Sequence, residues 1–123
     1  MIKKINLEEY IRNIPDFPKP GILFRDVSTL IQEDKAFLAS IDMLADKFKG
    51  KAIDKIAAVE ARGFIFGAAL AYRLKTGFIP IRKKGKLPFK STSVTYNLEY
   101  GTDTLEIHTD AVKKGERILI VDD

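Results

Sequence analysis

The last apolar segment of the chain places the tightest limit on its fold. Ile118–Val121 is a run of four branched aliphatic residues, followed at once by Asp122 and Asp123. Because no polar residue interrupts the run, it predicts a strand buried on both faces, as in parallel sheets. Ligands of open α/β sheets bind beyond the carboxyl ends of such strands. The two carboxylates therefore stand where a sugar's hydroxyl groups or a hydrated metal ion can be held.

Composition excludes several classes of protein. A chain of 123 residues, 46% hydrophobic and 31% charged, is expected to form one domain at most. It has no cysteine and a single histidine, His108, so disulfides, thiolate metal sites and histidine clusters are excluded. No apolar run approaches the roughly 20 residues of a membrane helix, and no signal-peptide core is present. The net charge of +4 is compatible with anionic small molecules or nucleic acid.

The first third of the chain is predicted to hold two helices around an irregular segment. Asn6 is expected to cap a first helix that runs to Ile14 and is stopped by Pro15. Residues 15–21 contain three prolines and cannot form a regular helix or strand. Asp34 is expected to cap a second amphipathic helix, which ends at a glycine.

The centre of the chain predicts a strand–helix–strand unit. Lys55–Val59 and 78–82 have the pattern of strands, and a helix is expected over 64–75, ended by Gly77 as its C-cap. Two strands joined by a helix over this length should be parallel. Further on, apolar and polar residues alternate over 94–107, which predicts a two-stranded ribbon with one apolar face.

Three loops are expected at the carboxyl ends of the predicted parallel strands, where they converge on one crevice. The loop 60–63 offers backbone N–H groups at a helix N-terminus together with Arg62, which suits an anion. The loop 82–86 carries four cations around a glycine, which suits phosphate or pyrophosphate. With Asp122 and Asp123 as the third member, the set fits a polyanionic sugar phosphate and Mg²⁺ bridging pyrophosphate oxygens.

Each feature taken alone also has a structural interpretation. The loop 60–63 is more often an exposed salt-bridged turn, and 82–86 more often a solvated loop. A pair of aspartates is as often a helix cap as a magnesium site. On composition, Phe24 is more often a core residue than a platform for a base, and His108 more often a polar-face residue than a catalyst. The joint placement at one sheet edge favours a site.

Five segments, in order from about Asp16 to the last residue, resemble adenine phosphoribosyltransferases. They are FPKPGILFRD at 17–26, like the purine-recognition segment; EARGFIFG at 60–67, like the pyrophosphate loop; PIRKKGKLP at 80–88, like the basic loop; LEYGTDTLEIH at 98–108, like the flexible hood; and 118–123, like the opening of the phosphoribosyl-diphosphate signature. The resemblance implies an α/β, type I phosphoribosyltransferase fold. In that fold a parallel sheet is flanked by helices and carries an antiparallel hood ribbon.

The resemblance also implies an activity. The reaction is the purine-salvage step in which adenine and 5-phosphoribosyl 1-diphosphate give AMP and pyrophosphate, with Mg²⁺ as cofactor. The metal is expected to be bound through pyrophosphate and water and by no side chain directly. These four small molecules are the expected partners, in a cytoplasmic homodimer that binds neither membrane nor nucleic acid.

Roles for individual residues follow from the same resemblance. Phe24 is expected to stack on adenine, while the backbone of Leu23 and Arg25 hydrogen-bonds the edge of the base. Pyrophosphate or phosphoribosyl diphosphate is expected to be bound by Glu60, Ala61, Arg62, Gly63, Arg82, Lys83 and Lys86, with Arg82 acting across a dimer interface and a cis peptide between Glu60 and Ala61. Asp122 and Asp123 are expected to bind ribose. Glu99 is expected to hold or shuttle a proton near adenine, and Tyr100 to help close the hood.

The resemblance sets the expected boundaries as well. Residues 1–123 are predicted to be a single phosphoribosyltransferase domain, incomplete at its C-terminus. An N-terminal helix and purine-recognition segment occupy 1–33, and a core occupies 34–123, with the hood ribbon at about 93–108. In the family, the two aspartates lead into a Thr- and Gly-rich loop that binds the 5′-phosphate. Without that loop, impaired or absent catalysis is expected.

Two other functions stay open. One is a non-catalytic purine- or phosphoribosyl-binding regulatory domain, or a fragment, on the same fold. The other is an interaction module whose bare sheet edge pairs with another chain. The hood residues Glu99 and Tyr100 favour the enzyme, and no helix-turn-helix signal with a basic recognition helix is present.

Overall fold

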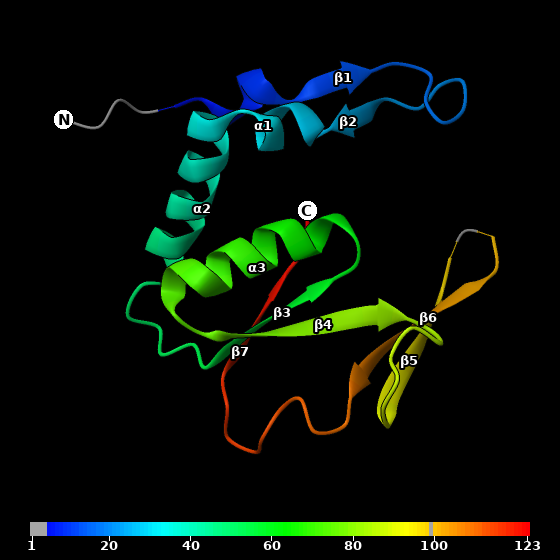
Figure 1. The fold of residues 1–123 in the computed structure, drawn as a ribbon. Coiled ribbons are helices and arrows are strands. Elements are labelled where there is room, and N and C mark those ends of the chain that lie inside the picture. Colours follow the sequence, from blue (N-terminus) through cyan, green and yellow to red (C-terminus); the bar gives the residue numbers. More distant parts are fainter. Residues whose placement is uncertain (1–4, 99) are drawn as a thin grey trace. The chain divides into compact units, whose positions relative to one another are not determined.

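The computed structural model describes residues 5–98 and 100–123. The chain divides into two compact units, Met1–Asp46 and Lys47–Asp123 (Figure 1). The prediction of a single domain over 1–123 stays a prediction. Within the described part of the chain, no helix combines the length and the apolar character that crossing a membrane requires.

The first unit holds short elements and one long helix. They are η1 (Leu7–Tyr10), β1 (Arg12–Ile14), β2 (Phe24–Asp26), α1 (Ser28–Gln32) and α2 (Asp34–Phe48), whose last two residues fall in the second unit. The expected cap is confirmed, since Oδ1 of Asn6 accepts the Glu8 N–H at 3.2 Å. The expected helix α2 is confirmed, and Gly50 follows it with a φ of +76°.

The prediction of a helix running to Ile14 is wrong. Only one turn of 3₁₀-helix forms, and the chain then becomes extended in β1. Pro15 disfavours helical backbone at the residue before it, which is Ile14. β1 instead pairs antiparallel with β2, and Ile14 lies opposite Phe24.

The irregular segment between β1 and β2 is confirmed. It contains a cis peptide at Phe17–Pro18 and positive φ angles at Asp16 (+55°) and Gly21 (+87°). Oδ1 of Asp16 accepts the Gly21 N–H at 2.8 Å. The hydrogen bond between Asp16 and Gly21 closes the loop, so that β2 can run back beside β1.

The second unit is built on a mixed sheet. Its elements are β3 (Lys55–Val59), α3 (Arg62–Leu74), β4 (Gly77–Lys83), β5 (Ser91–Asn97), β6 (Thr102–His108) and β7 (Ile118–Val121). The strand order is β5-β6-β4-β3-β7. β3 pairs parallel with both β4 and β7, whereas β6 pairs antiparallel with β4 and β5. A parallel sheet that carries an antiparallel ribbon is the predicted arrangement.

α3 packs closely against the parallel strands (Figure 1). Ile56 of β3 and Leu70 of α3 are fully buried. A Cβ added at Gly67 would lie 2.6 Å from Cβ of Ala58, so only glycine allows this approach of helix to sheet. The prediction that Gly77 caps α3 is wrong. Lys75 takes the left-handed conformation at the C-cap, with a φ of 60°, and Gly77 begins β4 opposite Lys55.

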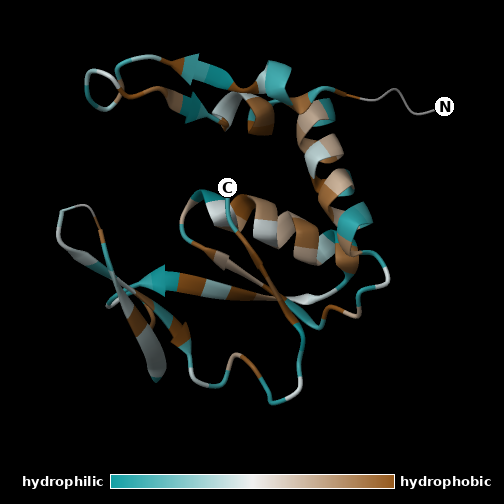
Figure 2. Ribbon diagram, turned by 180° about the vertical axis from the view of Figure 1, so that it is seen from behind, coloured by the Kyte–Doolittle hydropathy of each residue, from teal (hydrophilic) through white to brown (hydrophobic). Residues whose placement is uncertain are grey.

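The prediction that the last strand is buried on both faces is also wrong. Val121 is 8% exposed, because its side chain lies on the face that α3 covers, whereas Ile120 on the other face is 66% exposed. Figure 2 colours most of β7 as hydrophobic up to a hydrophilic end. Ile120 lines a groove of about 370 Å³ with Val59, Ile81, Thr92, Ser93, Val94, Leu105, Glu106 and Ile107. The apolar side of the hood ribbon thus continues onto the open face of the sheet.

Candidate functional site

The first and third predicted loops lie against each other at the carboxyl edge of β3 and β7. Arg62, the first residue of α3, forms an ion pair with the carboxylate of Asp123. A Cβ added at Gly63 would lie 3.0 Å from Oδ1 of Asp122, so a larger residue would displace that carboxylate. The peptide between Glu60 and Ala61 is cis, as expected. The helix N-terminus and the two aspartates that follow β7 therefore share one site.

The first and second loops are joined through Glu60. Its Oε1 accepts the backbone N–H of Lys83 at 2.8 Å and the Nε–H of Arg82 at 3.2 Å. The hydrogen bond from Lys83 is the main reason that the pKa of Glu60 lies below its ordinary value, with Arg82 and Lys86 acting in the same direction and burial opposing. Glu60 is therefore an ionised anchor of the basic loop.

The backbone of the basic loop is occupied by bonds within the protein. The N–H of Lys84 donates to the carbonyl of Thr104 at 3.1 Å, and that of Gly85 donates to Oε1 of Glu106 at 2.6 Å. The N–H of Lys86 donates to the carbonyl of Lys83 at 3.2 Å. Four successive amides, from Lys83 to Lys86, are thus engaged. An anion at this loop must therefore be held by side chains.

Three of the predicted phosphate-binding cations already contact carboxylates. Besides the pair of Arg62 with Asp123, Arg82 contacts Glu60 at 3.2 Å and Nζ of Lys83 lies 3.8 Å from Asp103. The three cationic side chains are 49%, 36% and 56% exposed. Exposed pairs of this kind contribute about 0–1 kcal/mol, so an incoming polyanion can displace the carboxylates.

Asp122 and Asp123 suit a cation that keeps its water ligands better than one bound directly by several side chains. The part of the chain that the structure describes holds no group of three or more His, Cys, Asp or Glu able to bind a metal ion. Asp122 and Asp123 are hard oxygen donors, as Mg²⁺ prefers, and Mg²⁺ retains most of its waters when few carboxylates are available. The residues therefore fit a magnesium ion held through water and a phosphate ligand.

The predicted adenine-binding residues belong to the first unit. Phe24 begins β2, and its ring meets that of Phe17 edge-on, with centroids 5.2 Å apart. Leu23 is 51% exposed. Leu23 immediately precedes β2, and Arg25 is the middle residue of that strand. In the described residues, β2 has β1 as its neighbour in a two-stranded sheet, which leaves one edge for a ligand.

The predicted hood is present as the β5–β6 ribbon. Glu99 lies outside the described residues. Tyr100 is 81% exposed beside the turn in which the Leu98 N–H donates to the carbonyl of Gly101 at 2.9 Å. The ribbon contacts the basic loop through Asp103, which lies 3.8 Å from Nζ of Lys83. Within the ribbon, Asp103 also accepts the hydroxyl of Tyr96 at 3.3 Å.

Two residues of this region, Asp103 and Glu106, were missed by sequence reasoning. Both lie on β6, and both contact the basic loop. The alternation of the ribbon places these two residues on opposite faces of β6 and does not predict what either one contacts.

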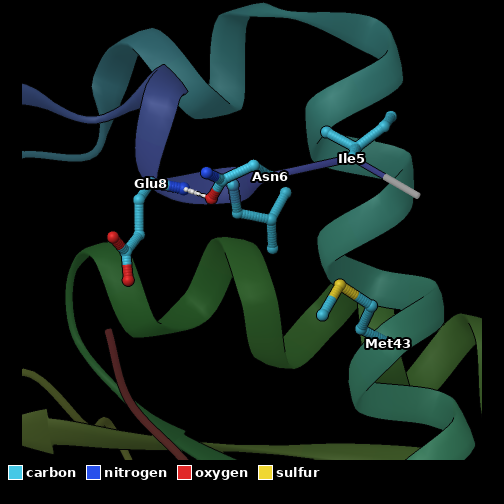
Figure 3. A pocket seen from close by; sticks show the side chains of 5 residues that line it. Ile5, Asn6, Glu8 and Met43 are labelled. Carbon is cyan, nitrogen blue, oxygen red and sulfur yellow. Dashed lines mark hydrogen bonds between the residues drawn. The ribbon is translucent and has the colours of Figure 1, made fainter.

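The first unit also contains a hollow of about 440 Å³, lined by Ile5, Asn6, Leu7, Glu8 and Met43. Figure 3 shows Met43 of α2 beside the segment that carries the capping bond of Asn6. None of the predicted site residues belongs to this lining, so the hollow has no part in the predicted site.

Comparison with known proteins identifies relatives over most of the chain. No protein-family model matches it. Over 119 residues the chain is 60% identical to adenine phosphoribosyltransferase of Brachyspira hyodysenteriae, covering 97% of this chain and 70% of that protein. It is 60% identical over 118 residues to the enzyme of Citrifermentans bemidjiense, covering 96% of this chain and 69% of the relative.

Solved structures agree with the relatives. Adenine phosphoribosyltransferase of Thermoanaerobacter pseudethanolicus superimposes with a TM-score of 0.90 at 59% identity, covering 96% of this chain and 70% of that one. The type I phosphoribosyltransferase fold predicted from the five segments is therefore confirmed. Identity at this level, over more than two thirds of a relative's length, establishes that the chain belongs to the adenine phosphoribosyltransferase family.

Proposed function

We propose that the chain acts in purine salvage by transferring a phosphoribosyl group from 5-phosphoribosyl 1-diphosphate to adenine, giving AMP and pyrophosphate. The observation that carries this proposal is the meeting of three loops at the carboxyl ends of β3, β4 and β7. Arg62 pairs there with Asp123, Asp122 lies beside Gly63, and Glu60 accepts the backbone N–H of Lys83. A family member from Saccharomyces cerevisiae, 40% identical with a TM-score of 0.89 and covering 95% of this chain and 69% of that one, has been solved with adenine bound.

The pyrophosphate group would be bound by basic side chains. Arg62, Lys83 and Lys86 would neutralise it as the bond to the anomeric carbon breaks, and Arg82 would act from across a dimer interface. When bound, Mg²⁺ would supply further neutralisation of this leaving group. Asp122 and Asp123 would orient the ribose by accepting hydrogen bonds from its hydroxyl groups. Positive charge that develops on the sugar ring, as in glycoside cleavage, favours carboxylates beside it.

Adenine would be bound by the segment that starts β2. The ring of Phe24 would stack on the base while Leu23 and Arg25 bond its edge through backbone groups. Backbone donors and acceptors of fixed position distinguish the amino group of adenine from the oxygen of other purines. Glu99 would hold or shuttle the proton of adenine as its other ring nitrogen attacks, and Tyr100 would help exclude water by closing the hood.

The experiment that tests this function separates binding from turnover. Calorimetry with Mg²⁺–pyrophosphate and with adenine measures binding to each unit, and chromatography of AMP measures the reaction. Saturable binding of pyrophosphate is expected. A chain that binds neither ligand and forms no AMP would contradict the proposal.

Two finer expectations are measured in the same assays. The expectation of impaired catalysis stays a prediction, and turnover equal to that of the Brachyspira hyodysenteriae relative would contradict it. Glu99→Ala is expected to lower turnover more than affinity for adenine, and an unchanged rate would remove its proposed role. A homodimeric state is part of the proposal, and light scattering measures it.

A further inference from the structure

Glu106 joins the basic loop to the hood ribbon. It lies in the middle of β6, opposite Arg82 of β4 on one side and Ser93 of β5 on the other. Its Oε1 accepts the N–H of Gly85 at 2.6 Å, and its Oε2 accepts the hydroxyl of Ser91 at 2.9 Å. One carboxylate therefore closes the connection between the centre of the loop and the first residue of β5.

The turn at the centre of the loop requires this acceptor. The bond from the Lys86 N–H to the carbonyl of Lys83 closes a four-residue turn whose third residue, Gly85, has a φ of +82°. Glycine is favoured at that position, and the turn's own bond does not use the N–H of Gly85. The Glu106 carboxylate accepts this N–H, so it stabilises the conformation that sets the directions of the neighbouring lysines.

A carboxylate in this place also acts against anion binding. The hydrogen bond from Gly85 first, and then that from Ser91, hold the pKa of Glu106 below its ordinary value; burial opposes them, and the charge of Lys84 adds the least. The side chain is thus negative at neutral pH, within a loop of cations that would receive a polyanion. Its charge lowers the attraction for pyrophosphate, whereas its hydrogen bonds shape the loop that binds it.

We propose that Glu106 is a positioning residue for pyrophosphate binding, acting through Gly85 on the side chains of Lys83, Lys84 and Lys86. The proposal rests on the proposed function of the loop. It requires that the hydrogen bonds of Glu106 strengthen pyrophosphate binding while its negative charge weakens it. Substitution can then separate the two effects. Glu106→Gln keeps an acceptor for Gly85 and removes the charge, while Glu106→Ala removes both.

The first test needs no ligand. In ¹⁵N-labelled protein, the amide proton of Gly85 is expected to shift upfield as the pH falls through the titration of Glu106, and Glu106→Gln should abolish this step. In Glu106→Ala the same amide should exchange with solvent about tenfold faster or more. Glu116→Ala is the matched control, because Glu116 also accepts a backbone N–H, that of Lys113, in the turn before β7. If the pH step and the exchange rate of the Gly85 amide are the same in both Glu106 variants as in the parent chain, the proposal is wrong.

The second test measures affinity for Mg²⁺–pyrophosphate by calorimetry. Glu106→Gln is expected to bind as tightly as the parent chain or about two- to fivefold more tightly, because a like charge is removed. Glu106→Ala is expected to bind at least about threefold more weakly than Glu106→Gln, because the turn is no longer fixed. Equal affinities of the two variants would refute positioning and leave a charge effect alone.

The two tests also separate this proposal from the proposed function. If the parent chain fails to bind pyrophosphate, the function of the loop is wrong, and the placement of Gly85 by Glu106 is still decided by its amide resonance. If Glu106→Ala does not fold, the pH step of Gly85 in the parent chain and its loss in Glu106→Gln decide the question.

Discussion

The carboxylate of Glu60 and the backbone N–H of Lys83 are joined at 2.8 Å across the carboxyl ends of β3 and β4. Glu106 and Glu116 make the same kind of contact, with Gly85 and Lys113, and a backbone hydrogen bond is the leading cause of a lowered pKa in all three glutamates. Each contact stabilises the fold more strongly while the glutamate is ionised, because a carboxylate is a better hydrogen-bond acceptor than the neutral acid.

A pH dependence of stability follows. A lowered folded-state pKa contributes stability that is fully present above the unfolded-state value, about 4.3, and is lost as the pH falls through the folded value. The free energy of unfolding is therefore expected to change little from pH 7 to 5 and to decrease below about pH 4. Urea denaturation at a series of pH values measures it. Glu60→Gln should make the decrease shallower, and an unaltered slope would contradict the role of Glu60.

The close approach of α3 to the sheet predicts a strong effect at one glycine. Gly67→Ala places a Cβ 2.6 Å from Cβ of Ala58 and 2.9 Å from the ring of Phe78. Overpacking costs about 1–3 kcal/mol and the gain in helix propensity is about 1 kcal/mol, so a net loss of up to about 2 kcal/mol is expected. Gly77→Ala is the control, because its Cβ would meet only Cγ of Lys55 at 3.7 Å. Chemical denaturation that ranks Gly77→Ala as the more damaging change would refute the packing argument.

The two faces of β7 predict different costs at adjacent positions. Val121→Ala is expected to lower the free energy of unfolding by about 1.5–3 kcal/mol, because the side chain is buried against α3. Ile120→Ala is expected to change it by less than about 0.5 kcal/mol, because Ile120 is 66% exposed. The midpoints of the denaturation curves of the two variants measure both losses. Similar losses at both positions would mean that the face bearing Ile120 is covered in solution.

Local patterns in the sequence predicted the elements whose ends are fixed by nearby residues. The strand Lys55–Val59 has the predicted bounds, and α2 forms where its apolar stripe predicts it, with Asp34 as its first residue and not its cap. β1 was predicted as helix because its partner β2 lies beyond three prolines. Lys75 took the left-handed position because Gly77 pairs in β4, which the helical pattern does not reveal.

The sequence was sufficient to predict which loops lie at the candidate site. The strand ends and their charges predicted that Arg62 and Asp123 lie at one edge, and their ion pair agrees. Lys83 is linked to that edge through Glu60. The bonds of Glu106 were not predictable, because they depend on the register of β6 against β4. A shift of one residue in that register would turn the side chain to the other face of the ribbon.

Arg62 offers a direct measure of anion binding at the edge of the sheet. Arg62→Ala is expected to weaken the affinity for Mg²⁺–pyrophosphate by about tenfold or more, since it removes charge-assisted hydrogen bonds and leaves Asp123 without this cation. Arg73→Ala, in the last turn of the same helix, removes an equal charge and should change the affinity little. Calorimetry at two salt concentrations makes the comparison. Equal losses in the two variants would show that net charge alone governs binding.

The occupied amides of Lys83 to Lys86 have a consequence for how this loop can change. Backbone N–H groups and their acceptors on Glu60, Thr104 and Glu106 fix the conformation of the loop. Its positive charge lies on lysine ammonium groups, which take no part in those bonds. The backbone therefore determines the shape of the loop, and the lysine side chains determine which ligand it prefers. The anion that the loop selects can be redesigned by exchanging lysines for other side chains, on a main chain that needs no redesign.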